Sequence, residues 1–432
     1  MSLRQNPTTQ LSVRASALIP RAFFQLREKR ITTLILIIAM AVMALRLSLG
    51  EVHAQDVAVP QKQSKPVPQA LWIVNGLSGG PNISIFQAAH LDKKTGEVAS
   101  AGIIADLNGS SLNGLTFDSS HNLWMSFCSS EQGFSGYLVE LSVAGLRHLV
   151  TNGRAKFTAI IEDPVTPGIA EYLDCPSSLR FDPAGNLWVQ VAGPSGPALL
   201  EYSSDEFEHS SHPIQPIPVA VINTSLLGNF RAVLTFDQEG NLWQSGGVIA
   251  EQNSQDEQQT VVEYTAAQLA TRVQTDPNET LIVADTSVTG ALNAPTSITF
   301  DGSGNLWVAF GLGSVSNLGG VEMFAAADLD GTGTLTPTPA VTIDSAAFAT
   351  KNLDLQSLDT PDGLAFDNEG DLWVANQSST ASEQPGRGSL VEFAASQLSA
   401  SGNPLPERAI VANQHNTNLA VPIYITFGPA LP

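Results

Sequence analysis

The stretch FDPAGNLW, residues 181–188, decides the fold of this chain because the sequence repeats it with small changes. Five copies are present: FDSSHNLW (117–124), FDPAGNLW (181–188), FDQEGNLW (236–243), FDGSGNLW (300–307) and FDNEGDLW (366–373). A sixth Leu-Trp pair at 71–72 lacks the first half, and a matching half, Ile425-Thr426-Phe427-Gly428, stands near the other end of the chain. The copies account for all six Trp residues, which are 52, 64, 55, 64 and 66 residues apart. A repeat of this length indicates an array of similar structural units.

Each copy has the pattern of a strand, a tight turn and a returning strand. Apolar residues alternate before the Asp, as at Leu179 and Phe181, and a period of two indicates a strand. Asp182 can accept backbone N–H bonds within the turn, and Gly185 can adopt a positive φ. His121 replaces this glycine in the copy at 117–124. Leu-Trp then starts the returning strand.

Two further elements recur after each Trp and complete a unit of four strands. The third element is an apolar strand that runs into a helical turn: ISIFQAAHL (83–91), LVELSVAGL (138–146), LLEYSSDEF (199–207), VVEYTAAQL (261–269), VEMFAAADL (321–329) and LVEFAASQL (390–398). The fourth is a short apolar strand that ends in Asp or Asn, at 103–106, 159–163, 219–223, 281–285, 341–344 and 410–413.

We therefore predict an all-β fold, a six-bladed β-propeller of four-stranded antiparallel blades over residues 70–432. The split sixth copy predicts that the C-terminal strand at 423–427 joins the N-terminal blade and closes the ring, which removes exposed strand edges. A stack of open sheets is the alternative arrangement. The Trp side chains are expected in the core between blades rather than in a ligand site.

The N-terminal region reads as a processing segment. A basic stretch at 21–30 precedes a largely apolar run at 31–45, and the small-residue site Val52-His53-Ala54 follows. This order predicts a signal peptide over residues 1–54 and hence a secreted or periplasmic protein. An uncleaved membrane anchor is the alternative, although the run is shorter than the ~20 residues of a spanning helix. Residues 55–69, rich in Pro, Gln and Lys, are expected to form a flexible linker.

The charge excludes one class of partner. The chain carries a net charge of −21, and residues 1–54 hold 7 of the 20 basic but only 2 of the 41 acidic residues, which leaves about −26 on the remainder. Such a surface repels phosphate backbones, so we expect no nucleic-acid partner. We expect a monomer with no membrane contact beyond the N-terminal segment. The acidic balance is compatible with a bound divalent cation such as Ca²⁺, although no cofactor is defined by the sequence.

One face of the predicted ring is the natural ligand site. The innermost strand of each blade starts on this face, and the next strand ends on it, around the mouth of the central channel. The polar residues expected there are Asn75, Asn113, Ser177, Thr296, Asp362 and Asn376. The two cysteines, Cys128 and Cys175, fall on the same face in neighbouring blades. In an exported chain this favours a disulfide, with two buried thiols or a redox pair as the alternatives.

The FDxxGNLW units resemble NHL-type repeats over residues 70–432. The segment PDGLAFDNEGDLWV (361–374) is also similar to the PDG segment of the SMP-30/gluconolactonase family, in which the Asp is a divalent-metal ligand and general base. That resemblance implies these roles for Asp362. At the family's other site positions, which hold an Asn, a Glu and a further Asn near the substrate, this sequence has Thr296, Ile423 and Ser177, so one residue of four matches.

The units also resemble streptogramin-lyase propellers, but no His/Glu pair stands at the starts of the innermost strands. Two hypotheses follow. The first is an exported propeller that binds or scaffolds a protein, carbohydrate or small molecule through its channel face, without a complete catalytic site. The alternative is a metal-dependent hydrolase of the SMP-30/gluconolactonase type centred on Asp362.

Overall fold

The computed structural model describes most of the chain from residue 69 onward. The described residues are 69–76, 83–91, 95–96, 102–104, 111–128, 136–152, 157–162, 173–191, 197–207, 213–223, 232–249, 258–275, 281–283, 295–310, 319–350, 353–377, 388–411, 419 and 421–430. The predicted signal segment and residues 55–68 of the linker lie outside them. Among the described residues, no helix has the length and apolar character needed to cross a membrane.

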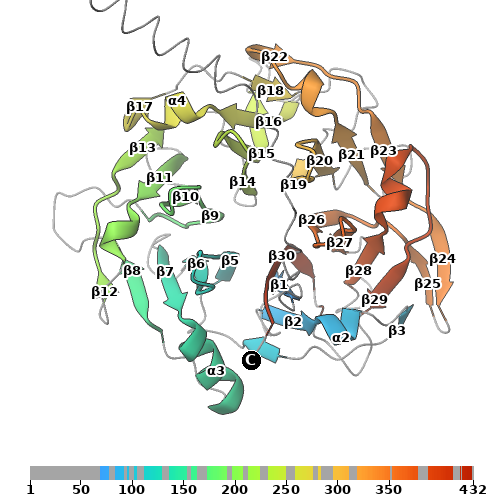
Figure 1. The fold of residues 1–432 in the computed structure, drawn as a ribbon, viewed down its shortest axis with the longest axis horizontal. Helices are drawn as coiled ribbons and strands as arrows, with labels where there is room; N and C mark the ends of the chain where they lie inside the picture. The colour runs from blue at the N-terminus through green and yellow to red at the C-terminus, as the bar shows by residue number, and fades with distance from the viewer. Residues whose placement is uncertain are drawn as a thin grey trace, which may run out of the picture. The chain divides into compact units, whose positions relative to one another are not determined.

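Six antiparallel sheets stand in a ring, and the four strands of each sheet follow one another outward from the axis (Figure 1). The predicted six-bladed β-propeller is therefore confirmed. Blades 1 to 3 consist of β30 (Pro422–Pro429), β1 (Gln69–Asn75), β2 (Ile83–Gln87) and β4 (Gly102–Ile104); β5 (Ser111–Phe117), β6 (Leu123–Cys128), β7 (Gly136–Leu141) and β8 (Ala159–Glu162); and β9 (Leu179–Phe181), β10 (Leu187–Val191), β11 (Ala198–Tyr202) and β13 (Ala220–Asn223). Blades 4 to 6 consist of β14 (Leu234–Phe236), β15 (Leu242–Ile249), β16 (Gln258–Tyr264) and β18 (Leu281–Val283); β19 (Pro295–Phe300), β20 (Leu306–Phe310), β21 (Gly320–Phe324) and β23 (Val341–Asp344); and β26 (Pro361–Phe366), β27 (Leu372–Asn376), β28 (Ser389–Phe393) and β29 (Arg408–Val411).

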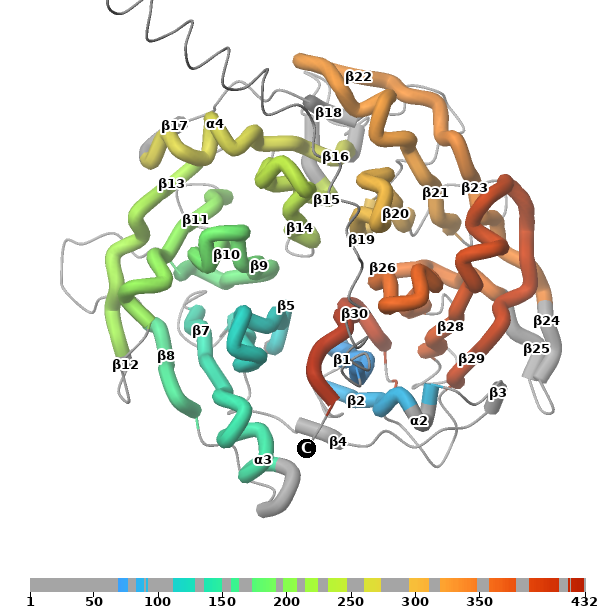
Figure 2. Tube along the Cα trace, viewed as in Figure 1, coloured from blue at the N-terminus to red at the C-terminus, as the bar shows by residue number. Residues whose placement is uncertain are grey.

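The ring closes within blade 1, where the two ends of the propeller pair. Strand β30 lies antiparallel to β1, with Thr426 opposite Trp72 and Tyr424 opposite Val74. Figure 2 shows the red C-terminal strand beside the blue N-terminal one. The predicted closure is confirmed, and it gives β1 a hydrogen-bonded neighbour on both sides.

An outer belt of short strands, which the repeat pattern does not predict, links the blades. A short strand from the third-to-fourth-strand connection of one blade pairs in parallel with the outermost strand of the preceding blade. The belt strands are β12 (Pro213–Ile214) on β8, β17 (Val273–Thr275) on β13, β22 (Gly333–Leu335) on β18 and β3 (Thr95–Gly96) on β29. A single bridge between Ile343 and Gly402 makes the same link between blades 5 and 6. A separate hairpin of β24 (Ala347–Thr350) and β25 (Leu353–Gln356) precedes blade 6.

Short helical turns follow the third strand of most blades. They are α2 (Ala88–Leu91), η1 (Ser204–Glu206), α4 (Ala266–Leu269), η2 (Ala326–Asp328) and η4 (Ala395–Ser399). Blade 2 differs, because its third strand is followed by the ten-residue helix α3 (Val143–Asn152).

The Trp side chains fill the space between blades, as predicted. All six are at most 3% exposed. In five places the motif Trp of one blade meets the motif Phe of the next blade edge-on, with ring centroids 5.1–6.5 Å apart. Trp124, for example, meets Phe181 at 5.9 Å. Edge-to-face packing of buried rings stabilises the joint between neighbouring sheets beyond the area that it buries.

Candidate functional site

The Asp of each FDxxGNLW turn has a structural task. In the copy at 181–188, Oδ1 of Asp182 accepts the backbone N–H of Asn186 at 2.8 Å, while Oδ2 accepts Nδ2 of Asn186 at 3.0 Å and Nε1 of Trp188 at 3.3 Å. Oδ1 of Asn186 in turn accepts the backbone N–H of Ser204 at the start of η1. The Asp–Trp bond recurs in all five copies. The predicted backbone hydrogen bonds to the Asp are confirmed. The Asp, Asn and Trp side chains of the motif form hydrogen bonds that stabilise the blade.

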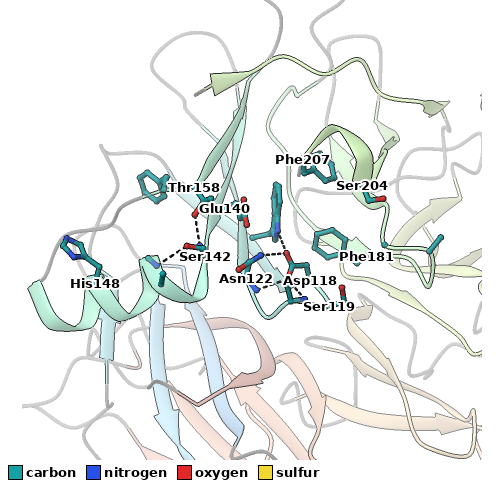
Figure 3. Close-up of a pocket in the computed structure, with 17 residues that line it drawn as sticks. Asp118, Ser119, Asn122, Glu140, Ser142, His148, Thr158, Phe181, Ser204 and Phe207 are labelled. Carbon is teal, nitrogen blue, oxygen red and sulfur yellow. Dashed lines mark hydrogen bonds between the residues drawn. The ribbon is translucent and has the colours of Figure 1, made fainter. Parts of the chain in front are cut away.

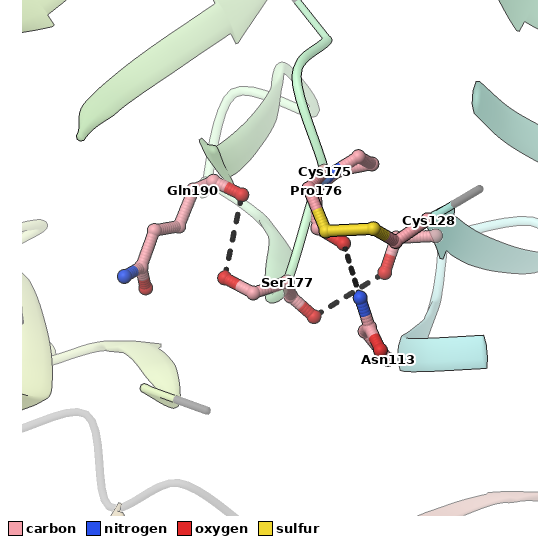
Figure 4. Close-up of a disulfide and its surroundings, with 7 residues drawn as sticks. Asn113, Cys128, Cys175, Pro176, Ser177 and Gln190 are labelled. Carbon is pink, nitrogen blue, oxygen red and sulfur yellow. Dashed lines mark hydrogen bonds between the residues drawn. A yellow bond between two sulfur atoms is a disulfide. The ribbon is translucent and has the colours of Figure 1, made fainter. Parts of the chain in front are cut away.

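The two cysteines form the predicted disulfide, which joins blade 2 to the segment that enters blade 3 (Figure 4). Asn113 lies beside it and donates from Nδ2 to the carbonyl oxygen of Pro176 at 3.0 Å. A disulfide is typical of proteins that work outside the cytoplasm.

Three of the residues expected at the channel mouth are β-bulge residues. Asn113, Thr296 and Asp362 each stand where the register between the first and second strand of the blade shifts by one. A bulge turns the extra residue out of the regular ladder and re-aims its side chain. In blade 1 the shift between β1 and β30 leaves Ile423 in the same position.

The remaining expected residues are engaged within the scaffold. Nδ2 of Asn376 donates to Oγ of Ser389 and to the carbonyl oxygen of Ser357, and its Oδ1 accepts the backbone N–H of Asp359. The bond between Asn376 and Ser389 links the second strand of blade 6 to the third. In blade 1, Asn75 makes the equivalent bond by donating from Nδ2 to Oγ of Ser84 at 3.0 Å. These amides therefore tie strands and connections together at the channel face.

Two hydroxyls brace neighbouring connections in the same way. Thr296 donates from Oγ1 to the carbonyl oxygen of Pro361 in the next blade at 2.6 Å and lies 3.2 Å from that of Ala309. Ser177 is 3% exposed and bonds the carbonyl oxygen of Gln190.

Asp362 is 5% exposed and lies on β26. Within the described part of the chain it belongs to no group of three His, Cys, Asp or Glu side chains that could share an ion; the one such group is Asp367, Asp371 and Glu392. At the positions that correspond to the SMP-30 ligands, the Thr296 hydroxyl is used in the brace to Pro361 and Ile423 offers no ligand atom. These residues do not fit the metal site of that family.

An axial cavity of about 270 Å³ lies against the innermost strands of blades 1 and 3 to 6. In each strand two apolar residues of the motif pack between blades, so the residue between them faces the other way. Five such residues line the cavity: Arg180, Thr235, Thr299, Ala365 and Thr426. Arg180 is the only charged residue among the described residues that line it.

Arg180 also lacks a partner in the part of the chain that the structure describes. Its guanidinium makes no hydrogen bond and no ion pair with any described residue. Arg408, by contrast, has a carboxyl partner, Glu392, at the outside of blade 6. The half-buried Arg180 therefore presents its positive charge to a cavity with three Thr in its wall.

No protein-family model matches the chain, so NHL and SMP-30 stay resemblances. No curated protein matches it either. Solved structures resemble it at low identity: a protein of unknown function from Bacteroides caccae (14% identity, 84% of this chain and 100% of that chain, TM-score 0.44), a putative 6-phosphogluconolactonase from Bacteroides uniformis (13%, 83% and 99%, 0.40) and virginiamycin B lyase from Staphylococcus aureus (11%, 81% and 95%, 0.37).

Sequence reasoning missed Arg180, although a signal was present. The repeat alignment places Thr116, Thr235, Thr299, Ala365 and Thr426 at the same position, and Arg180 is the one charged residue in that series. A large cation among five small side chains in a repeated motif is a departure that the fold alone does not require.

Proposed function

We propose that this protein is an exported β-propeller that binds a small organic anion, a carboxylate or a phosphate ester, in its axial channel and does not catalyse a reaction on it. The observation that carries the proposal is Arg180, which faces the cavity without a carboxylate partner among the described residues. Arginine is suited to this task because its planar guanidinium forms two parallel hydrogen bonds with a carboxylate or phosphate group.

The surroundings of Arg180 support an anion rather than a structural ion pair. Thr235, Thr299 and Thr426 line the same cavity and can donate hydroxyl hydrogen bonds to a polar ligand. The acidic outer surface repels anions, but salt screens exposed charges that lie more than ~8–10 Å away. Short-range contacts inside a concave site of low dielectric then decide the binding free energy.

Export is supported by two independent features. The order of charged, apolar and small residues over 1–54 is that of a secretory signal. The Cys128–Cys175 disulfide fits an oxidising compartment. The ligand is therefore expected to be a solute of the extracellular or periplasmic space.

The test is a calorimetric titration of the protein purified from a secreting host that expresses the full chain. D-glucuronate and glucose 6-phosphate probe the two anion classes, and D-glucose is the neutral control. We expect one or both anions to bind, D-glucose not to bind, and R180Q to weaken binding about tenfold or more. R272Q is the matched control, because Arg272 is an exposed cation outside the cavity.

Three results would overturn the proposal: no binding of either anion, equal binding by R180Q, or an equal loss in R272Q. R180K, which keeps the charge but not the bidentate geometry, provides a second variant and is expected to bind with intermediate affinity. Metal-dependent hydrolysis of D-glucono-1,5-lactone that disappears in D362N would replace the proposal with the hydrolase alternative.

A further inference from the structure

A second cavity, of about 1090 Å³, opens between blades 2 and 3 on the face of the ring that carries the FDxxGNLW turns. Its wall from blade 2 includes Asp118, Trp124, Glu140 and the helix α3, and its wall from blade 3 includes Phe181 and Phe207 (Figure 3). It is separate from the axial channel, and none of the channel-face residues lines it.

The special form of blade 2 accounts for the size of this cavity. Helix α3 stands where other blades have a single helical turn, and its residues Ala144, Gly145 and His148 line the cavity. The corresponding space between blades 4 and 5 measures about 450 Å³, and none of the α4 residues is among the described residues that line it.

A carboxyl group recurs on the third strand of four blades, directly opposite the Trp. The cross-strand pairs are Trp124–Glu140, Trp188–Glu201, Trp243–Glu263 and Trp373–Glu392. Blades 5 and 1 have Met323 and Ile85 at this position. Because the four Glu residues occupy equivalent positions in their blades, the interactions of their carboxyl groups can be compared directly.

Three of these carboxyls have an interaction partner. Glu201 accepts a hydrogen bond from Nδ2 of Asn186 at 2.9 Å and is attracted by Arg272. Glu392 accepts a hydrogen bond from Nη1 of Arg408. Glu263 also takes part in an electrostatic or hydrogen-bonding interaction.

Glu140 differs from the other three. Within the described residues its carboxyl makes no hydrogen bond and no ion pair. Nδ2 of Asn186 donates to both Asp182 and Glu201, whereas Nδ2 of Asn122 donates to Asp118 alone. The residue is 7% exposed and lines the cavity. Burial and, to a smaller extent, the negative charge of Asp118 raise the pKa of Glu140 to about 7. A buried carboxylate without a counter-charge is unfavourable, so this site would gain from a cation.

We propose that the cavity between blades 2 and 3 binds an organic cation, an amine attached to an apolar group the size of one aromatic ring, with the Glu140 carboxylate as its counter-ion. Phe181, Phe207 and Trp124 would contact the apolar group, and an ammonium group is attracted to aromatic ring faces. Ser142 and Thr158 stand beside Glu140 and can accept further N–H bonds (Figure 3).

This proposal predicts a coupling between binding and protonation. Besides Glu140, the charged and titratable side chains among the lining residues are Asp118 from the same blade and His148 from α3, and blade 3 contributes none. An amine that binds the ionised form must lower the pKa of Glu140 and release a proton. At pH 7, close to the pKa of Glu140, the release is a fraction of a proton per amine bound.

The experiment is a calorimetric titration of the purified full-chain product with benzylamine, and with benzyl alcohol as the uncharged control. Titration in two buffers of different ionisation enthalpy measures the proton release. We expect benzylamine to bind more tightly at pH 8.5 than at pH 5.5, and E140Q to weaken binding about tenfold or more. E201Q is the matched control, because Glu201 holds the same position but is already hydrogen-bonded.

H148N separates the contribution of the histidine, and it is expected to keep the dependence on pH. The proposal fails if benzylamine releases no proton from the unmutated protein, if E140Q binds as well as the unmutated protein, or if E201Q loses as much affinity. Benzyl alcohol that binds as tightly as benzylamine would likewise show that the cavity recognises only the apolar group. The proton release needs no variant, so the test remains decisive if E140Q fails to fold.

Discussion

The indole Nε1 of Trp72 donates a hydrogen bond to the carbonyl oxygen of Pro429, 357 residues further along the chain, at 3.2 Å. In the five complete copies the same indole nitrogen bonds the Asp of the turn. Blade 1 has no such Asp, because Gly428 follows Phe427 where the other copies have Asp. The backbone of β30 therefore supplies the acceptor that the motif supplies elsewhere.

Removal of β30 is expected to open the ring. A chain that ends after Val421 exposes one edge of β1 and uncovers Leu71 and Ile73, both now fully buried. We expect this variant to lose cooperative unfolding or to aggregate, as measured by thermal unfolding and gel filtration. Deletion of Ala430–Pro432 alone, beyond the strand, is the control and should leave Tm unchanged. An unchanged Tm in the longer deletion would contradict closure by β30.

Reduction of the disulfide is expected to destabilise the fold. Cys128 and Cys175 are 47 residues apart, and a cross-link over a loop of that length typically contributes about 2–4 kcal/mol. We therefore expect urea unfolding to shift to lower concentration in the presence of a reductant. The double variant C128S/C175S should show the reduced midpoint and no response to reductant. A response that persists in this variant would mean that the reductant acts elsewhere.

The turn at 117–124 stores backbone strain at His121, which has φ +66° where the other four turns have glycine at +80° to +89°. A residue with a Cβ is unfavourable in this region, by about 1 kcal/mol. H121G is expected to raise the free energy of unfolding by up to ~1 kcal/mol, and G185A in the next blade to lower it by a similar amount. Urea unfolding of both variants checks the pair, and a loss of stability in H121G would count against strain at this turn.

Blade 6 replaces the motif Asn with Asp371, and this places three carboxyls together. Asp371 cannot donate to Asp367 as Asn186 donates to Asp182. Burial raises the pKa of Glu392 to about 8; Arg408 opposes the shift, while Asp371 and Asp367 support it. The folded protein therefore holds a proton on Glu392 that the unfolded chain, with a pKa of 4.5, releases at neutral pH.

A carboxyl with a raised pKa stabilises the fold at low pH and loses that contribution as the pH rises. We expect the free energy of unfolding to decrease between about pH 4.5 and 8, with a slope of at most ~1.4 kcal/mol per pH unit from Glu392. D371N restores the amide and should reduce this slope. The reciprocal variant N186D should increase it by placing an Asp beside Glu201. Urea unfolding at pH 5, 6, 7 and 8 measures both, and equal slopes in all three proteins would refute the assignment to Asp371.

The sequence alone determined the architecture. Six Leu-Trp positions, alternating apolar residues and Asp-containing turns are local signals, and the split copy at 71–72 and 425–428 showed how the ring closes. The strand order within each repeat also predicted the cysteine pairing, because it places both residues on the same face of neighbouring blades. These predictions succeeded since each depends on which residues repeat and at what spacing.

Tertiary structure decided the sites. The bulges that carry Asn113, Thr296 and Asp362 depend on strand register, and the belt strands are only two or three residues long, with partners in another blade. Glu140 and Glu201 occupy the same place in the repeat, yet among the described residues only Glu201 accepts a hydrogen bond from the motif amide and is attracted by an arginine. The charge state of a buried carboxyl is set by the atoms around it in space, and the order of residues along one blade does not contain them.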